Sequence, residues 1–218
     1  MEVRGKYRKT TMKNITLILT ALFLFSCNNT TTEKQTSNAP SDTFRQFLRK
    51  FKIIDLPFVY RYVDFKENFD LDKMPSIDIK SIDTLFIKKG YPEGIKFYSI
   101  LPDTSKFFSL IYFYPADSYY PILVTYDKKG KQIDETALIV NGCGGDCGLQ
   151  YCSSTGIINN DLSIFCADTL VWEYFCDSLS QPIPNSDIVW IDSKTGKLTN
   201  NGKLKMTNDK HEEKKNNR

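Results

Sequence analysis

The sequence contains little histidine: its 218 residues include only one, His211, inside a charged tail. A Ser-His-Asp triad, a Cys-His pair and a histidine-based metal centre each need a histidine beside other reacting groups. Also missing are the phosphate-binding loop, the dinucleotide fingerprint, the EF-hand and the nucleophile elbow. The sequence therefore identifies no catalytic residue, no metal ligand and no cofactor.

Long hydrophobic runs are absent as well. The most hydrophobic segment, residues 15–25, has 11 residues. At 1.5 Å rise per residue it is too short to cross a bilayer core of about 30 Å. Five basic residues and one acid precede it, and the small residue Ser26 follows. This arrangement predicts a secretory signal peptide over residues 1–26.

The residues at the end of this segment predict a lipid anchor. Leu24-Phe25-Ser26-Cys27 resembles the bacterial lipobox, in which the cysteine is lipidated and becomes the mature N-terminus. Acylation of Cys27 would hold the protein at a membrane through its buried methylene groups. The alternative is an ordinary cleaved signal peptide in which Cys27 has no role. A start at Met12 would leave a compact basic region before the same hydrophobic segment.

The chain has no basic surplus once the signal peptide is removed. The full sequence carries 29 Lys+Arg and 26 Asp+Glu, and residues 1–26 hold five of the bases and one of the acids. The net charge of the mature chain is therefore about −1. Nucleic-acid binding, which depends on neutralising phosphates, is excluded.

Composition divides the mature chain into three parts. Residues 27–40 are polar with no apolar period and predict a flexible tether, whereas residues 207–218 are almost wholly polar and predict a disordered tail. Residues 41–206 are long enough for one domain with a sizeable core. The domain begins with a predicted amphipathic helix, capped by Ser41 or Asp42. Its apolar stripe consists of Phe44, Phe47, Leu48 and Phe51.

The rest of the domain is rich in β-branched and aromatic residues and predicts strand after strand. Predicted strands cover residues 57–64, 83–88, 94–101, 106–114, 119–126, 131–140, 161–167, 170–176 and 187–193, with a short pair near 197–206. No helical stretch of 10–15 residues separates them, so parallel βαβ units are excluded. The predicted fold is mainly β, an antiparallel meander that forms a curved sheet or a sandwich, with one N-terminal amphipathic helix.

Two local patterns refine this prediction. Phe107–Tyr114 is apolar on both faces and predicts a central strand. Asp127-Lys-Lys-Gly130 and Asp192-Ser-Lys-Thr-Gly196 are near-copies. Asp at the start and Gly at the end of a short loop suit a type I turn with a left-handed last residue, so both predict hairpin turns.

Five cysteines lie beyond residue 27: Cys143, Cys147, Cys152, Cys166 and Cys176. Three of them lie in segment 141–152 with four glycines. An exported chain meets an oxidising environment, which favours disulfides. Two disulfides among five cysteines leave one cysteine unpaired, and 15 such pairings are possible. A zinc-finger-like metal site needs paired Cys-X-X-Cys motifs as ligands. A thiol-redox site needs a cysteine of low pKa, commonly in a Cys-X-X-Cys motif. Neither element is present.

Other polar and aromatic residues give weaker signals. Glu135 and Glu173 could form a glycosidase-type carboxylate pair, although solvated positions explain them better. Trp172 and Trp190, with Tyr119, Tyr120 and Tyr174, could form a platform for stacking sugars, although strand aromatics more often pack in the core.

The lipobox leader, the Phe-rich helix running into Ile54-Asp-Leu-Pro57-Phe and the Gly-Cys-Gly-Gly-Asp-Cys-Gly loop together resemble small uncharacterised lipoproteins of Bacteroidota. The resemblance implies an envelope location and no activity. Surface-exported lipoproteins of that phylum carry acidic residues just after the lipidated cysteine; Asn28-Asn-Thr departs from this, which favours the periplasmic side of the outer membrane. Three Asp-Ser/Thr-apolar triplets also resemble O-glycosylation sites of that phylum. They would modify Thr84, Thr169 and Ser178.

These observations predict a lipid-anchored, non-enzymatic envelope domain that binds a protein or glycan partner. Its membrane contact would be the N-terminal lipid. The alternative is a periplasmic enzyme, either a carboxylate hydrolase or a thiol-redox protein. A cleft with two convergent carboxylates, or an exposed thiol beside Lys or Arg, would favour the enzyme.

Overall fold

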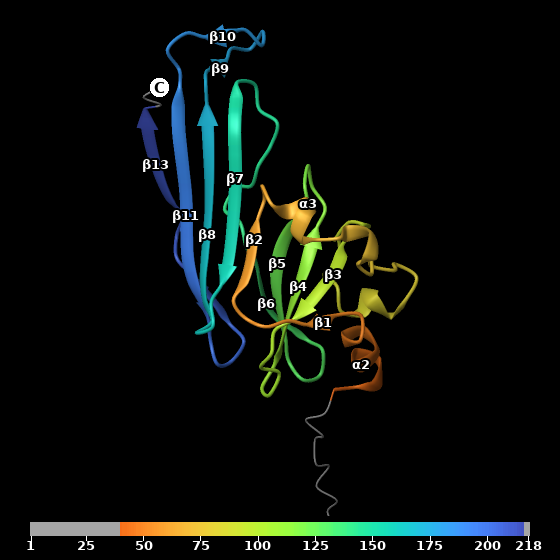
Figure 1. The fold of residues 1–218 in the computed structure, drawn as a ribbon. Helices are drawn as coiled ribbons and strands as arrows, with labels where there is room; N and C mark the ends of the chain where they lie inside the picture. The colour runs from red at the N-terminus through yellow and green to blue at the C-terminus, as the bar shows by residue number, and fades with distance from the viewer. Residues whose placement is uncertain (1–39, 216–218) are drawn as a thin grey trace, which may run out of the picture. The chain divides into compact units, whose positions relative to one another are not determined.

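The structure, a computed structural model, describes residues 40–215. The predicted signal peptide, Cys27 and almost all of the predicted tether lie outside the described residues, as do residues 216–218. The described residues belong to one compact unit, 38–218. As predicted, this unit is mainly β, with antiparallel sheets and a helix at its start (Figure 1).

Helix α2 (Asp42–Leu48) opens the domain where the apolar stripe predicts it. Ser41 is the N-cap, and its hydroxyl accepts a hydrogen bond from the Phe44 backbone N–H at 3.2 Å. Phe44 and Phe47 are both completely buried. The helix ends before Phe51, whose ring packs edge-on against Phe47 with centroids 5.4 Å apart. The stripe therefore docks the helix onto the domain through aromatic contacts.

The first sheet has the strand order β1-β3-β4-β5-β6. Its strands are β1 (Lys52–Ile53), β3 (Lys96–Ile100), β4 (Phe108–Tyr114), β5 (Tyr120–Tyr126) and β6 (Gln132–Ala137). The β1–β3 pair is parallel and the other three pairs are antiparallel. Strand β4 lies at the centre, which confirms the prediction for Phe107–Tyr114. Three helical turns, α3 (Phe65–Asn68), η1 (Leu71–Lys73) and η2 (Ile82–Leu85), lie between β2 and β3.

The second sheet has the order β12-β11-β8-β7-β2, with β13 paired to β11. Its strands are β2 (Phe58–Arg61), β7 (Leu149–Ile158), β8 (Ser163–Trp172), β11 (Ile188–Leu198), β12 (Leu204–Met206) and β13 (Lys210–Lys215). All the pairings within it are antiparallel. A separate hairpin, β9 (Phe175–Cys176) with β10 (Pro182–Ile183), follows β8.

The two sheets pack face to face around a shared core, which makes the fold a sandwich. That core combines Phe113 and Leu123 of the first sheet with Phe58, Ile158 and Ile164 of the second. A second core, on the other face of the first sheet, contains Phe44 and Phe47 of α2 together with Leu110 and Tyr112 of β4. Strand β4 is thus buried on both faces, which explains its apolar run.

Several predicted strand boundaries were wrong. Residues 161–167 and 170–176 were expected to form two strands, but Ser163–Trp172 is one strand because β11 pairs along its entire length. Strand β7 was not predicted, since its sequence of small and polar residues follows the glycine-rich loop. Residues 83–88 contain no strand and begin within the 3-10 turn η2, where the buried Asp83 side chain accepts a hydrogen bond from the Asp78 backbone N–H.

One of the two predicted hairpin turns is absent from the described fold. Asp127…Gly130 forms its turn, with the Gly130 N–H donating to the Asp127 carbonyl at 3.1 Å and Gly130 at φ +87°. Asp192…Gly196 instead lies inside the long strand β11. The Asp192 side chain bonds to Asn141, in the loop after β6, and to His211 of β13 rather than closing a turn. Gly196 allows close approach of Met206 on β12. The same local pattern thus serves two structures.

The tail predicted to be disordered, residues 207–218, contains a strand. Lys210–Lys215 form β13, all six residues of which pair with Ser193–Ile188 of β11 although their side chains are exposed. Its pairing comes from backbone hydrogen bonds, which need no apolar side chains. Its many charged side chains are typical of an edge strand that resists pairing with other chains.

Candidate functional site

The Gly-Cys loop, residues 138–148 between β6 and β7, is held by two disulfides. Cys143 is bonded to Cys152 and Cys147 to Cys176. This pairing is one of the 15 arrangements that the sequence left open. Two bonds leave one of the five cysteines that the structure describes unpaired, and that cysteine is Cys166.

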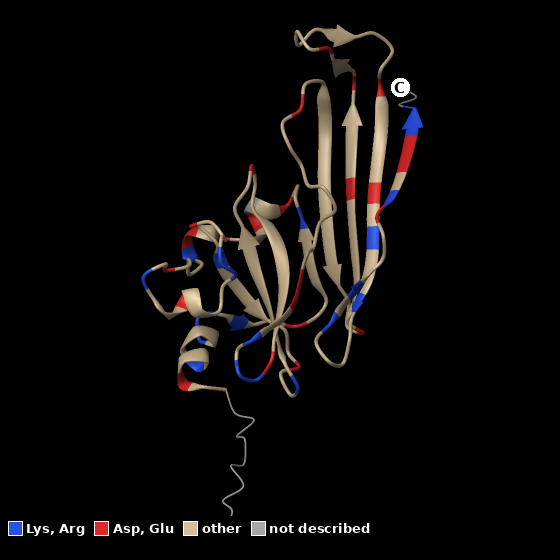
Figure 2. Ribbon diagram, turned by 180° about the vertical axis from the view of Figure 1, so that it is seen from behind, with Lys and Arg blue, Asp and Glu red and all other residues tan. Residues whose placement is uncertain are grey.

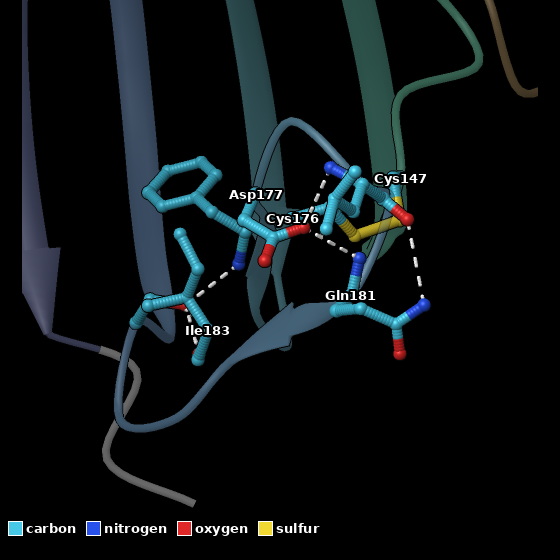
Figure 3. The surroundings of a disulfide bond; sticks show 8 residues. Cys147, Cys176, Asp177, Gln181 and Ile183 are labelled. Atoms are coloured by element: carbon cyan, nitrogen blue, oxygen red, sulfur yellow. Dashed lines mark hydrogen bonds between the residues drawn. A yellow bond between two sulfur atoms is a disulfide. The ribbon is translucent and has the colours of Figure 1, made fainter.

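The Cys147–Cys176 bond links the Gly-Cys loop to the β9–β10 hairpin. Figure 3 shows the two sulfurs beside the turn between Asp177 and Gln181. The Asp177 carboxylate accepts hydrogen bonds from the backbone N–H groups of Leu179 and Gln181, at 2.8 and 2.9 Å. The disulfide therefore attaches the loop to a turn that is itself rigid.

Cys166 lies in the core between the sheets and is completely buried. Burial raises the pKa of its thiol to about 12. A reactive thiol needs the opposite conditions, a lowered pKa and access to solvent. The unpaired cysteine is therefore a core residue and gives no support to thiol-redox chemistry.

Two buried carboxylates that the sequence did not predict as site residues lie directly under the Gly-Cys loop. Asp168 of β8 and Asp192 of β11 are cross-strand partners, and they are 0% and 7% exposed. Figure 2 shows acidic residues side by side near the middle of β8 and β11. Asp168 Oδ2 accepts hydrogen bonds from the backbone N–H groups of Asn141 and Gly142, the latter at 2.7 Å. Asp168 thus fixes the backbone at the start of the loop.

A row of side chains across four strands extends this anchor. Ser154, Asp168, Asp192 and His211 are successive register partners on β7, β8, β11 and β13. Asn141 donates from Nδ2 to Asp192 Oδ2 at 2.9 Å, and Asp192 Oδ1 lies 2.6 Å from His211 Nδ1. The C-terminal strand is thereby connected to the Gly-Cys loop through side-chain hydrogen bonds.

This loop forms one wall of a tyrosine-lined cleft of about 310 Å³. Its lining comes mainly from three segments: Tyr60 of β2 with the nearby Tyr62, the β4–β5 loop with the first residue of β5 (116–120), and residues 141–144 of the Gly-Cys loop. Tyr60 is almost completely buried and donates to the Tyr119 carbonyl at 3.0 Å. Burial raises the pKa of the Tyr60 hydroxyl, so Tyr60 stays neutral and rigid. The volume lies at the lower end of the range for ligand sites, about 300–1,000 Å³.

The cleft offers aromatic rings, hydroxyls and backbone amides rather than charge. Four of its lining residues are tyrosines, two are serines, and Asp117 carries its only ionisable carboxylate. Asp168 and Asp192 do not line it, and their hydrogen bonds hold Asn141 and Gly142 in place. The chemistry of the lining suits a neutral ligand with many hydroxyl groups.

The other predicted site residues are dispersed. Glu135 lies on β6 and interacts with Lys88, Tyr91 and Gln132, while Glu173 follows β8 in the other sheet. Trp172 of β8 and Trp190 of β11 pack together, with ring centroids 4.4 Å apart, as a pair on neighbouring strands of the second sheet. Tyr119 and Tyr120 line the cleft.

The three candidate O-glycosylation residues differ in access. Thr84 and Ser178 are exposed, and Thr169 on β8 is half-buried. Thr84 follows the buried Asp83 within the 3-10 turn η2, and Ser178 lies in the turn after Cys176. Their modification stays a prediction, as does that of Thr169.

Residues 40–215 contain no group of three or more His, Cys, Asp or Glu side chains able to hold a metal ion. Within the same range, no helix has the length and hydropathy of a membrane-spanning segment.

No protein-family model matches the chain, and no curated protein or solved structure matches it either.

The two disulfides should contribute unequally to stability. In the loop-entropy description the bond of sequence separation 9 contributes about 2.6 kcal/mol and the bond of separation 29 about 3.6 kcal/mol. We expect Cys147→Ser/Cys176→Ser to lower the free energy of unfolding by about 1 kcal/mol more than Cys143→Ser/Cys152→Ser. Urea unfolding of both variants measures the difference, and the reverse order would contradict this assignment.

His211 should make the docking of β13 depend on pH. Hydrogen bonds to Asp192 and Glu213 raise its pKa above the value in the unfolded chain. Its stabilising contribution is therefore complete below the unfolded pKa of about 6.5 and is lost as pH rises through the raised folded pKa. The unfolding free energies of wild type and His211→Gln should differ most at acidic pH and converge at alkaline pH. A pH-independent difference would contradict this role.

Proposed function

We propose that this chain is a lipid-anchored lipoprotein of the bacterial envelope, held by acylated Cys27 on the periplasmic side of the outer membrane, whose domain binds a glycan without transforming it. The resemblance of its leader and loop to Bacteroidota lipoproteins supports the location. The disulfides Cys143–Cys152 and Cys147–Cys176 support exposure to an oxidising compartment.

The tyrosine-lined cleft is the observation that carries the binding function. Tyrosine supplies a large, rigid contact surface with a polar tip at a low cost in conformational entropy. The nearby hydroxyls and loop amides supply donors and acceptors that match sugar hydroxyls. Because Asp168 and two disulfides hold the loop, little ordering is required when a ligand binds.

A glycan array with the mature protein, extracted in mild detergent, tests this proposal. We expect neutral oligosaccharides to bind, and Tyr62→Ala and Tyr120→Ala each to weaken that binding at least about tenfold. Tyr151→Ala is the matched control, since Tyr151 is 46% exposed on β7 outside the cleft. Absence of glycan binding, or equal loss with Tyr151→Ala, would contradict the assignment.

A protein partner is the second candidate, and it would use the outer face of the second sheet. Val59, Phe165 and Tyr151 are 39%, 38% and 46% exposed there. Val59 and Phe165 are both register partners of Ile157, so their side chains share one face. If a protein partner binds this face, Phe165→Lys should abolish crosslinking to that partner and leave glycan binding intact. Tyr62→Ala should weaken glycan binding and leave the crosslinking intact.

A further inference from the structure

A second cavity, of about 570 Å³, lies at the other end of the sandwich core. It forms where the β3–β4 loop meets the β7–β8 turn and the end of β11. Six of its ten lining residues are apolar: Leu56, Leu101, Pro102, Phe107, Leu162 and Leu198. A cavity of this size and lining suits an aliphatic ligand.

The cavity contains an unsatisfied hydroxyl. Ser109 of β4 lines it, is 1% exposed, and its Oγ has no hydrogen-bond partner within the described residues. Leaving a buried hydroxyl unpaired costs about 1–3 kcal/mol. A ligand carbonyl that accepts a hydrogen bond from Ser109 would recover this cost.

The rim of the cavity carries two carboxylates. Asp55 and Asp103 line it and are exposed, beside the neutral Asn160. Hydrogen bonds from the backbone N–H and the side chain of Ser105 lower the pKa of Asp103, with smaller contributions from nearby lysines, so it carries its negative charge at neutral pH. A free carboxylate or phosphate head would be repelled there, whereas a hydroxyl-bearing head would find acceptors.

The β3–β4 loop and the β7–β8 turn, which supply lining residues of the cavity, lie at the same end of the domain as the start of α2 (Figure 1). A Cβ atom on Gly130, in the β5–β6 turn, would lie 2.9 Å from the Phe44 ring of α2. Lys128 of the same turn donates to the Thr104 carbonyl in the β3–β4 loop. Fourteen Cα steps from Cys27 to Ser41 span at most about 50 Å, so an anchor at Cys27 would keep this end near the bilayer.

We propose that this cavity binds the acyl chain of an uncharged membrane lipid ester, of the monoacylglycerol class. The chain lies against Leu101, Leu162 and Leu198, the ester carbonyl accepts from Ser109 Oγ, and the glycerol hydroxyls face Asp55 and Asp103. The choice of a membrane lipid as the ligand rests on the proposed lipid anchor. The existence of the cavity and the chemistry of its lining are independent of that anchor.

Photolabelling tests this inference without depending on the anchor. The full-length protein in detergent-free nanodiscs is irradiated with a diazirine-bearing monooctanoylglycerol, and labelled peptides are identified by mass spectrometry. We expect saturable labelling within residues 101–109 and 159–165. Monooctanoylglycerol should displace the label at least tenfold more effectively than octanoate, because the acidic rim repels the carboxylate.

Two matched variants locate the site. Ser109→Val removes the hydroxyl and places two methyl groups at this position, and we expect at least a tenfold loss of labelling. Ser99→Val is the control: Ser99 is also buried and without a partner in the described structure, but it does not line the cavity. Thermal unfolding checks that both variants fold. Labelling spread over other peptides, or equal labelling of the two variants, would overturn the inference, even if Cys27 proves to be acylated.

Discussion

Replacing Asp168 by alanine should lower the free energy of unfolding by about 3–6 kcal/mol and abolish glycan binding. The carboxylate accepts two backbone hydrogen bonds, from Asn141 and Gly142, and is completely buried. Hydrogen bonds to a charged group contribute about 1.5–3 kcal/mol each. Without Asp168 both amides lose their acceptor, and the wall of the cleft that they form is no longer fixed.

Urea unfolding and glycan titration measure the two effects of Asp168→Ala. Asp146→Ala is the matched control, because Asp146 belongs to the same loop but is exposed; it should change neither quantity appreciably. Asp168→Asn keeps one acceptor oxygen and should recover part of both losses. If Asp168→Ala leaves glycan binding intact, the carboxylate does not position the cleft.

Replacing Lys50 by methionine should destabilise the domain by about 3–5 kcal/mol, because it leaves a buried charge unpaired. Lys50 Nζ lies 2.6 and 2.7 Å from the two carboxylate oxygens of Asp83, which is completely buried. Asp83 also accepts from the Asp78 backbone N–H at 3.0 Å. The pair therefore joins the residues after α2 to the 78–83 segment.

The charge itself can be separated from the packing of the lysine stem. Lys50→Met/Asp83→Asn removes both charges and should be less destabilising than Lys50→Met alone. Lys89→Met, at an exposed lysine, should change the unfolding free energy by less than about 0.5 kcal/mol. A Lys50→Met variant as stable as the Lys89→Met control would show that Asp83 does not depend on this partner.

Local patterns predicted the parts of the fold that local physics decides. The stripe of Phe44 and Phe47 marked α2, and the doubly apolar run of Phe107–Tyr114 marked the central strand. Strand β13 could not be predicted in this way, because its charged side chains carry no apolar alternation and its partners are backbone groups of β11. The hairpin turn predicted at Asp192…Gly196 was wrong because the same short sequence pattern can also occur inside a strand, here β11.

The candidate site was even less visible in the sequence. Asp168 and Asp192 are 24 residues apart, and only the register between β8 and β11 brings them together. The cleft likewise combines Tyr60 and Tyr119 with the Gly-Cys loop, from three separate segments. The loop itself was recognisable from its cysteines and glycines, whereas its anchoring depends on pairings between distant strands.

The central claim, an exported and lipid-anchored oxidised domain, is tested most directly by the intact mass of the mature protein after thiol alkylation. The protein should begin at Cys27 with attached acyl chains. Alkylation of the unfolded, unreduced protein should add one group, at Cys166, and four more after reduction. An unprocessed chain without acyl groups, carrying all its thiols free before reduction, would contradict the account.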